Sequence, residues 1–331
     1  MALNIGLIGL KGHQGTITNG IKLVEGARMA AVCDDDESKL AGVSGYPGAH
    51  DNTRTFTSPA QMLDETELDI VGVCGTDSER APVILEAAKR GIHVLAEKPL
   101  AMDLDELAQV RQAVADTGIH LSMLLTMRFE PAYLTINRMI REGAIGEVCL
   151  ATMQKSYRLG DRPQWQRSRK TFSGIVPFIG IHALDLIRWT TGREFVRGAA
   201  VCDNTGHPDI RDLEDNASVI VQLDNGGSAS ARMDYCRPAA APTHGDDKLR
   251  VAGNEGVIES DQQGERVIYI HPEDGARELE LDEKRDQFVD FVGSIRGDNE
   301  SWVPAEDCFR MTEITLKLRD VANSTQTADL T

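Results

Sequence analysis

The sequence has few cysteines, and no two of them form a C-x-x-C pair. Three of the six, Cys33, Cys74 and Cys149, fall inside apolar strand-like runs. Buried, unpaired cysteines are typical of proteins that work in a reducing compartment. We therefore predict that these three thiols are buried and that the protein is cytoplasmic. The other three cysteines are Cys202, Cys236 and Cys308.

Long apolar runs are also missing, and none reaches the length of a membrane span. We expect no secretory leader, because residues 4–8 (NIGLI) are already typical of a first strand. Internal repeats and low-complexity tracts are not found. These absences favour a soluble globular protein, and a length of 331 residues suggests two domains.

Basic residues are fewer than acidic ones: the chain has 35 Lys and Arg residues and 52 Asp and Glu residues, which gives a net charge of −17. So acidic a chain is a poor partner for nucleic acid or an anionic membrane. A locally basic pocket for a small molecule is still compatible with this balance.

The first 36 residues follow the order of a dinucleotide-binding βαβ unit. Residues 4–10 predict a strand, a glycine turn follows, residues 16–25 predict a helix, and residues 30–33 predict a second strand. Asp34 then stands where an acid can reach the ribose hydroxyls of the cofactor. The glycines allow close approach of the pyrophosphate, and the helix amino end attracts its charge.

The glycine fingerprint is imperfect. In the G-x-G-x-x-G frame that begins at Gly9, Lys11 takes the second glycine position and Gln14 the third. The loop also reads as G-x-x-G-x-x-G, and a plain tight turn is the alternative. Asp34 makes nucleotide binding the favoured interpretation.

The acidic tip, defined as Asp34, Asp35 and Asp36, favours NAD over NADP, because its carboxylates would repel a 2′-phosphate. Asp35 and Asp36 could instead only cap the next helix. Lys11 or Lys39 could still accommodate a phosphate.

The stretch Gly91 to Leu100 (GIHVLAEKPL) predicts a buried strand that ends at Glu97-Lys98-Pro99. Proline cannot continue a central ladder, so Lys98 would lie at the carboxyl end of the strand, where open α/β sheets bind their ligands. A lysine there can contact both cofactor and substrate. A solvated lysine at a strand end is the alternative.

Strands alternate with helices up to about residue 125, which predicts a doubly wound parallel sheet. A helix over 131–142 and a long strand over 147–157 follow. Helices are predicted over 282–296 and 305–323. Between them, a mostly antiparallel sheet is predicted from the segments 199–203, 217–223, 227–235, 248–253, 256–260 and 266–271.

The chain resembles the glucose–fructose oxidoreductase / inositol dehydrogenase / MocA family over essentially its full length. The matching residues are the glycine turn from Gly9, Asp34, residues 96–101 (AEKPLA), Arg128-Phe129, Pro131-Ala132-Tyr133, residues 143–148 (GAIGEV), residues 180–185 (GIHALD) and residues 305–307 (AED). The resemblance implies an NAD(P)-binding Rossmann domain over 1–125. It also implies a C-terminal α+β domain over 126–331, with an open sheet that binds substrate and builds homodimers or homotetramers.

The resemblance further implies hydride transfer between a nicotinamide cofactor and a sugar, a cyclitol or a related polyol, including anionic sugar derivatives. The predicted catalytic residues are Lys98 and His182. The predicted cofactor-binding residues are Gly9, Lys11, Gly12, His13, Gln14, Asp34, Asp35, Thr76, Asp77, Glu97, Lys98 and Arg128. The predicted substrate-binding residues are Lys155, Tyr157, Arg158, Trp165, His182 and Asp185.

The chain departs from the family at Phe178, where active members commonly carry an aspartate four residues before the histidine. Histidine suits proton transfer near neutral pH, so His182 stays the predicted base. Purely structural roles for His182 and Asp185 are the alternative. A metal site formed with His244 or Asp246 is a weaker one, and no metal is expected.

The segment 155–170 carries six basic residues against Asp161, its one acid, a local charge of +5. Arginine forks suit carboxylates and phosphates, so the segment predicts recognition of an anionic group of the substrate or of the cofactor pyrophosphate. Docking on an acidic neighbouring subunit explains the same charge.

Two other functions fit the chain. The first is a non-catalytic protein that binds nucleotide or sugar and regulates a partner, an interpretation that Phe178 and the altered glycine loop favour. The second is transient oxidation with tightly held NAD, followed by elimination or hydrolysis.

Overall fold

The computed structural model describes residues 3–261 and 264–324, which divide into two compact units. Of these residues, 3–126 and 286–313 form the N-terminal unit, and 127–261, 264–285 and 314–324 form the C-terminal unit. The return of 286–313 to the first unit was not expected from the sequence. Helix α9 (Ala305–Asn323) contributes its first part to one unit and its second part to the other.

A six-stranded, fully parallel sheet in the order β3-β2-β1-β4-β5-β6 forms the centre of the N-terminal unit. Its strands are β1 (Leu3–Ile8), β2 (Ala27–Cys33), β3 (Arg54–Phe56), β4 (Ile70–Val73), β5 (His93–Ala96) and β6 (Leu121–Met123). Its helices are α1 (Gln14–Ile21), α2 (Glu37–Leu40), α3 (Pro59–Glu65), α4 (Asp77–Lys89), α5 (Leu104–Thr117) and α8 (Gln287–Arg296). The strand order reverses direction between β1 and β4, which is the topological switch point where such sheets bind ligands.

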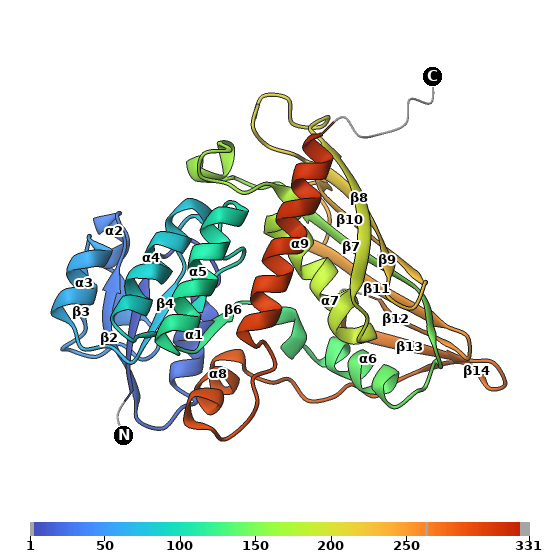
Figure 1. Cartoon of the computed structure of the whole chain (residues 1–331), viewed down its shortest axis with the longest axis horizontal. Helices are drawn as coiled ribbons and strands as arrows, with labels where there is room; N and C mark the ends of the chain where they lie inside the picture. The colour runs from blue at the N-terminus through green and yellow to red at the C-terminus, as the bar shows by residue number, and fades with distance from the viewer. Residues whose placement is uncertain (1–2, 262–263, 325–331) are drawn as a thin grey trace. The chain divides into compact units, whose positions relative to one another are not determined.

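Helices cover both faces of this sheet (Figure 1). Right-handed crossovers place α1 on one face and α4 and α5 on the other. Helix α8 joins the face of α1, where Phe288 and Phe291 complete the core that Ile5 and Ile17 begin. Strands covered on both faces are apolar throughout, which explains the uninterrupted runs at β4 and β5.

The C-terminal unit is built on an eight-stranded sheet in the order β14-β13-β12-β11-β7-β10-β9-β8. Every neighbouring pair is antiparallel except β7 with β10. Its strands are β7 (Val148–Arg158), β8 (Phe195–Asp203), β9 (Asn216–Leu223), β10 (Ser228–Arg237), β11 (Gly245–Gly253), β12 (Val257–Asp261), β13 (Arg266–His271) and β14 (Gly275–Glu278). The expected fold class, a doubly wound sheet followed by a mostly antiparallel one, is thereby confirmed.

Helices α6 (Pro131–Arg141) and α7 (Ile181–Thr191) lie on one face of this sheet (Figure 1). Along β7 the buried side chains Ala151, Met153 and Lys155 alternate with more exposed ones, as a sheet covered on one face requires. The uncovered face carries a hollow of about 680 Å³, floored by small side chains such as Thr152, Ser218 and Ser230.

The prediction for Cys149 is wrong, because its side chain is exposed on β7 while Cys33 and Cys74 are buried. A strand of a sheet covered on one face leaves half of its side chains toward solvent, whatever their polarity. All six cysteines are free thiols. Among the described residues, no helix has the length and apolar character that crossing a membrane requires.

Candidate functional site

The glycine turn of the N-terminal unit brings two strand ends into direct contact. Gly9 has φ +84°, and a Cβ there would collide with the backbone of Gly75, which follows β4. The amide of Lys11 donates to the carbonyl of Cys74 at 3.1 Å. The turn is therefore bound to the end of β4, and only glycine tolerates this approach at position 9.

Glu97 connects the end of β5 to the start of α1. Its carboxylate accepts from the backbone amide of His13, and Nδ1 of His13 lies 2.8 Å from Oε1. A Cβ at Gly12 would collide with this carboxylate, which explains the glycine. Burial alone would raise the pKa of Glu97, but His13, Lys98 and Arg80 outweigh burial and hold the pKa well below its usual value.

The ionised state of Glu97 gives a testable pH dependence. Since its pKa is lower in the folded than in the unfolded chain, its stabilisation is present above about pH 4.5 and is lost as the pH falls further. We expect Glu97→Gln to lower the free energy of unfolding by about 1–3 kcal/mol at pH 7. The difference from wild type should shrink below pH 4.5, as measured by urea unfolding. Exposed Glu25→Gln is the control, and a difference independent of pH would contradict the assignment.

The acidic tip follows β2. Asp34 is buried, and its carboxylate accepts from the amides of Leu10 at 2.7 Å and Asp36 at 3.0 Å. Asp35 is exposed and pairs with Lys11 at 2.8 Å, which lowers the pKa of Asp35. Burial would lower the pKa of Lys11, but Asp35 and Glu79 raise it. The lysine at the second glycine position is thus neutralised by acids of the unit.

A cavity of about 290 Å³ opens at the carboxyl ends of β1, β2 and β4. Four of the predicted cofactor residues, Gly9, Lys11, Asp34 and Asp35, line it. The other lining residues are Ile8, Cys33, Thr57, Pro59, Val73, Gly75, Ser78, Glu79, Pro82 and Val83. Apolar walls with carboxylates at one end suit an adenine ring with its ribose hydroxyls, so the residues present fit the adenosine half of NAD.

The remaining predicted cofactor residues of this unit have structural contacts. Thr76 and Glu79 form a capping box at the start of α4. Asp77 is fully buried and pairs with Arg80 at 2.8 Å, and Arg80 also donates to the carbonyl of Pro99 at 2.7 Å. Gln14 accepts from the amide of Gly12 at 3.1 Å. These contacts hold the loops after β4 and β5 together.

Lys98 lies where the sequence predicts it, directly after β5, and is 2% exposed. Its backbone amide donates to Oε2 of Glu97 at 3.3 Å, and the peptide to Pro99 is cis. The Lys98 side chain is thus withdrawn from solvent, at the edge where open parallel sheets bind their ligands.

In the C-terminal unit, His182 is the second residue of α7 and is 6% exposed. A π-helical turn, Val176–Gly180, precedes α7, and such turns are frequent at functional sites. Gly180 lies against Met233 of β10, and Met233 pairs in register with Lys155 of β7. The start of α7 therefore lies over the row of the sheet that contains Lys155.

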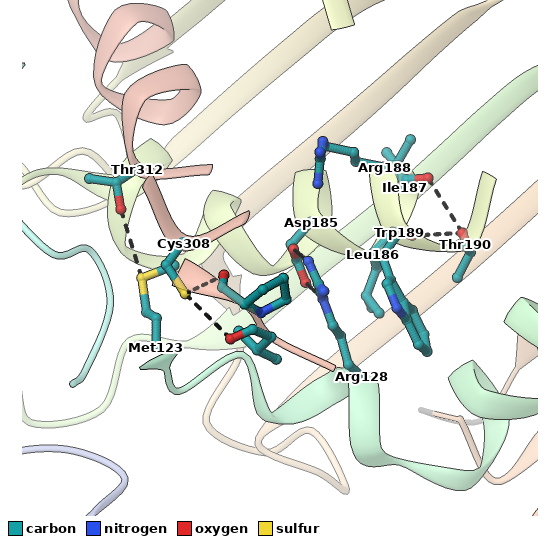
Figure 2. A network of polar contacts seen from close by, with 12 residues as sticks. Met123, Arg128, Asp185, Leu186, Ile187, Arg188, Trp189, Thr190, Cys308 and Thr312 are labelled. Carbon is teal, nitrogen blue, oxygen red and sulfur yellow. Dashed lines mark hydrogen bonds and ion pairs between the residues drawn. The ribbon is translucent and has the colours of Figure 1, made fainter. Parts of the chain in front are cut away.

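Arg128 and Asp185 form a buried ion pair with two contacts, at 2.9 and 2.5 Å (Figure 2). The guanidinium also lies 5.7 Å from the ring centroid of Trp189. These residues were predicted to bind cofactor and substrate, respectively. The structure shows that they contact each other, between the 3₁₀ turn Thr126–Phe129 and α7, and their ligand-binding roles stay a prediction.

Lys155 and Tyr157 lie on the same face of β7, as predicted, with Nζ of Lys155 4.9 Å from the ring centroid of Tyr157. Nζ also lies 2.5 Å from Oδ2 of Asp247 on β11. Burial would lower the pKa of Lys155, but Tyr157 and Asp247 raise it, so the ammonium keeps its proton. The sequence did not predict Asp247 as part of the site. The one indication is that Asp247 lies on the same face of β11 as the buried residues Leu249 and Val251.

Phe178 belongs to an aromatic cluster with Trp165 and Phe172, with ring centroids 5.1 to 6.2 Å apart. Trp165, a predicted substrate residue, therefore packs against the side chain that stands in place of the usual aspartate. An aromatic cluster at this position supplies shape and apolar contact but no proton acceptor.

Comparison with known proteins agrees with this arrangement. Residues 3–124 match the model of an oxidoreductase family with an NAD-binding Rossmann fold, and residues 133–259 match the GFO/IDH/MocA C-terminal domain. The NAD-binding domain expected from the sequence is thereby confirmed.

Inositol 2-dehydrogenase 2 of Saccharopolyspora erythraea is 30% identical over 68% of this chain and 65% of its own length. The match thus spans just under two thirds of that relative. Inositol 2-dehydrogenase of Rhizobium meliloti is 28% identical over 83% of this chain and 80% of its own. A solved structure from Thermotoga maritima has 34% identity and a TM-score of 0.92, and the match covers 98% of this chain and 99% of that one. The chain belongs to the GFO/IDH/MocA oxidoreductase family.

Proposed function

We propose that the protein is an NAD-dependent dehydrogenase that oxidises a carbinol carbon of a sugar, a cyclitol or a related polyol, or reduces the corresponding carbonyl. The observation that carries the proposal is the cavity at the ends of β1, β2 and β4, walled by Asp34 and Asp35. Relatives named inositol 2-dehydrogenase support the substrate class.

Some residues of the chain bind the cofactor, and others contact the substrate and transfer its proton. Asp34 and Asp35 accept hydrogen bonds from the ribose hydroxyls and repel a 2′-phosphate. When bound, NAD supplies the hydride acceptor. The sequence motifs that carry Lys98 and His182 support a hydrogen bond from Lys98 to the substrate hydroxyl and removal of the hydroxyl proton by His182 as general base. Because Phe178 supplies no carboxylate, His182 works without the acid that active relatives commonly carry.

We also propose that the protein acts in the cytoplasm as a homodimer or homotetramer. Scattered cysteines without a C-x-x-C pair suit a reducing compartment. The uncovered sheet face, with its hollow over Thr152, Ser218 and Ser230 and the exposed Ile220 nearby on β9, offers a broad surface for a second copy.

The test is a parallel titration of the purified apo protein with NADH and NADPH, followed by turnover assays with NAD and a panel of cyclitols and aldoses. We expect NADH to bind at least about tenfold more tightly, which corresponds to about 1.4 kcal/mol. At least one polyol should form NADH. Failure of both nucleotides to bind would contradict the proposal.

A second candidate, a non-catalytic protein that binds nucleotide or sugar and regulates a partner, is favoured by Phe178 and its aromatic cluster. It predicts that NADH binds and that no polyol of the panel is turned over.

A further inference from the structure

The six basic residues of the segment 155–170 fall into three groups by their surroundings. Three of them have acid partners: Lys155 with Asp247 at 2.5 Å, Arg167 with Asp161 at 3.4 Å, and Arg169 with Glu214 at 2.9 Å. Lys170 is exposed to solvent. Arg158 and Arg162 remain, and both are partly buried.

Within the described part of the chain, neither Arg158 nor Arg162 forms an ion pair with a carboxylate. Arg158 donates to the carbonyl of Ala241, and Arg162 donates to Gln166 Oε1 and to the Arg158 carbonyl, each at 3.3 Å. Nε of each guanidinium is buried and has no hydrogen-bond partner. In a chain with 17 more acidic than basic residues, two partly buried arginines with no carboxylate partner among the described residues need an explanation.

The Arg158 backbone connects Arg162 with His244, because the Arg158 carbonyl accepts from Arg162 at 3.3 Å. The amide of Arg158 donates to the carbonyl of His244 at 3.0 Å, and Arg162 lies 4.2 Å from the ring centroid of Tyr235. Burial lowers the pKa of His244, and Arg162 and Arg158 lower it further. Two cations close to one imidazole repel its protonation and each other, and an anion bound among them would relieve that repulsion.

Hydroxyl-binding groups adjoin this cluster. The ring of His244 stacks on Tyr157 at 5.2 Å, and Tyr157 Oη lies 3.5 Å from Asp247 Oδ2. The other carboxylate oxygen of Asp247 is buried and has no hydrogen-bond partner. A phenol, an imidazole and a carboxylate oxygen without a hydrogen-bond partner suit the hydroxyls of a polyol.

We propose that Arg158 and Arg162 bind an anionic group of the substrate, so that the protein acts on a polyol that carries a carboxylate or a phosphate. This inference rests on the proposed function and names its substrate class. Guanidinium forks bind either group with paired hydrogen bonds. The phenol and carboxylate beside them hold the hydroxyls of the same molecule.

The experiment measures binding of D-gluconate, D-glucose 6-phosphate and neutral myo-inositol to the NADH complex by calorimetry. It uses wild type, Arg158→Gln and Arg162→Gln. The matched control is Lys170→Gln, an exposed lysine of the same segment. We expect an anionic probe to bind wild type more tightly than myo-inositol. Each test variant should weaken that binding about tenfold to a hundredfold, and the control less than twofold.

The gluconate and glucose 6-phosphate arms distinguish a carboxylate from a phosphate. Unchanged binding in both test variants would overturn the inference, and so would a variant that alters only the oligomeric state in size-exclusion chromatography. A thermal unfolding midpoint like that of wild type shows that a variant is folded.

The same measurements separate this inference from the proposed function. If wild type binds an anionic probe, Arg162→Gln loses that binding, and wild type turns over no polyol, the dehydrogenase is rejected and the anion site is retained. If wild type turns over a neutral polyol and Arg162→Gln does so at the same rate, the dehydrogenase is retained and the anion site is rejected.

Discussion

Replacement of Lys98 by methionine should reduce kcat by about three orders of magnitude while leaving NADH affinity within a few-fold of wild type. Lys98 is nearly buried directly after β5, and methionine keeps most of its volume without the ammonium group. A positioned proton donor or relay contributes about 10²- to 10⁴-fold to the rate of such a step. Steady-state kinetics with the best polyol and fluorescence titration with NADH provide the measurement.

Lys89→Met is the matched control for this variant. Lys89 lies in the same unit on α4, is exposed, and pairs with Glu86 at 2.6 Å. We expect its kcat to stay within twofold of wild type. If Lys98→Met keeps more than a tenth of wild-type activity, Lys98 is a structural residue at the strand end, and another group must serve the substrate hydroxyl.

The fold was predictable where burial leaves a repeating pattern. Strands β4 and β5 are covered on both faces and read as continuous apolar runs, whereas β9 and β10 alternate. β3 has three residues and β14 is exposed throughout, so neither carries such a pattern, and both were missed. Helix α8 was predicted five residues too long at its start, because the Asp286 side chain accepts from the Val289 amide and begins the helix there.

The site was predictable only where one local motif carries it. The acidic tip and Lys98 each follow a strand, so the sequence places them at the ligand-binding edge. The partner of Lys155 is Asp247, 92 residues away, and strand pairing between β7 and β11 brings them together. No spacing in the sequence encodes that register, so the sequence identified the lysine and missed the carboxylate.

Arg128 and Asp185 were predicted to bind ligands, and the structure shows an ion pair between them that the sequence did not predict. The two residues are 57 positions apart and almost fully buried. We expect Arg128→Met and Asp185→Asn each to lower the free energy of unfolding by about 3–5 kcal/mol, because each change leaves one buried charge without its partner. Urea unfolding followed by circular dichroism provides the measurement.

The double variant Arg128→Met/Asp185→Leu decides between an ion pair that only supports the fold and residues that bind ligand. Removing both charges leaves no buried ion without a partner, so most of the lost stability should return. Arg138→Met is the control, because Arg138 pairs with Asp282 at the surface and should contribute less than about 1 kcal/mol. A stable double variant with normal NADH affinity and normal KM assigns Arg128 and Asp185 to folding alone. A stable double variant with weaker NADH affinity or a raised KM shows that Arg128 or Asp185 also contributes to ligand binding.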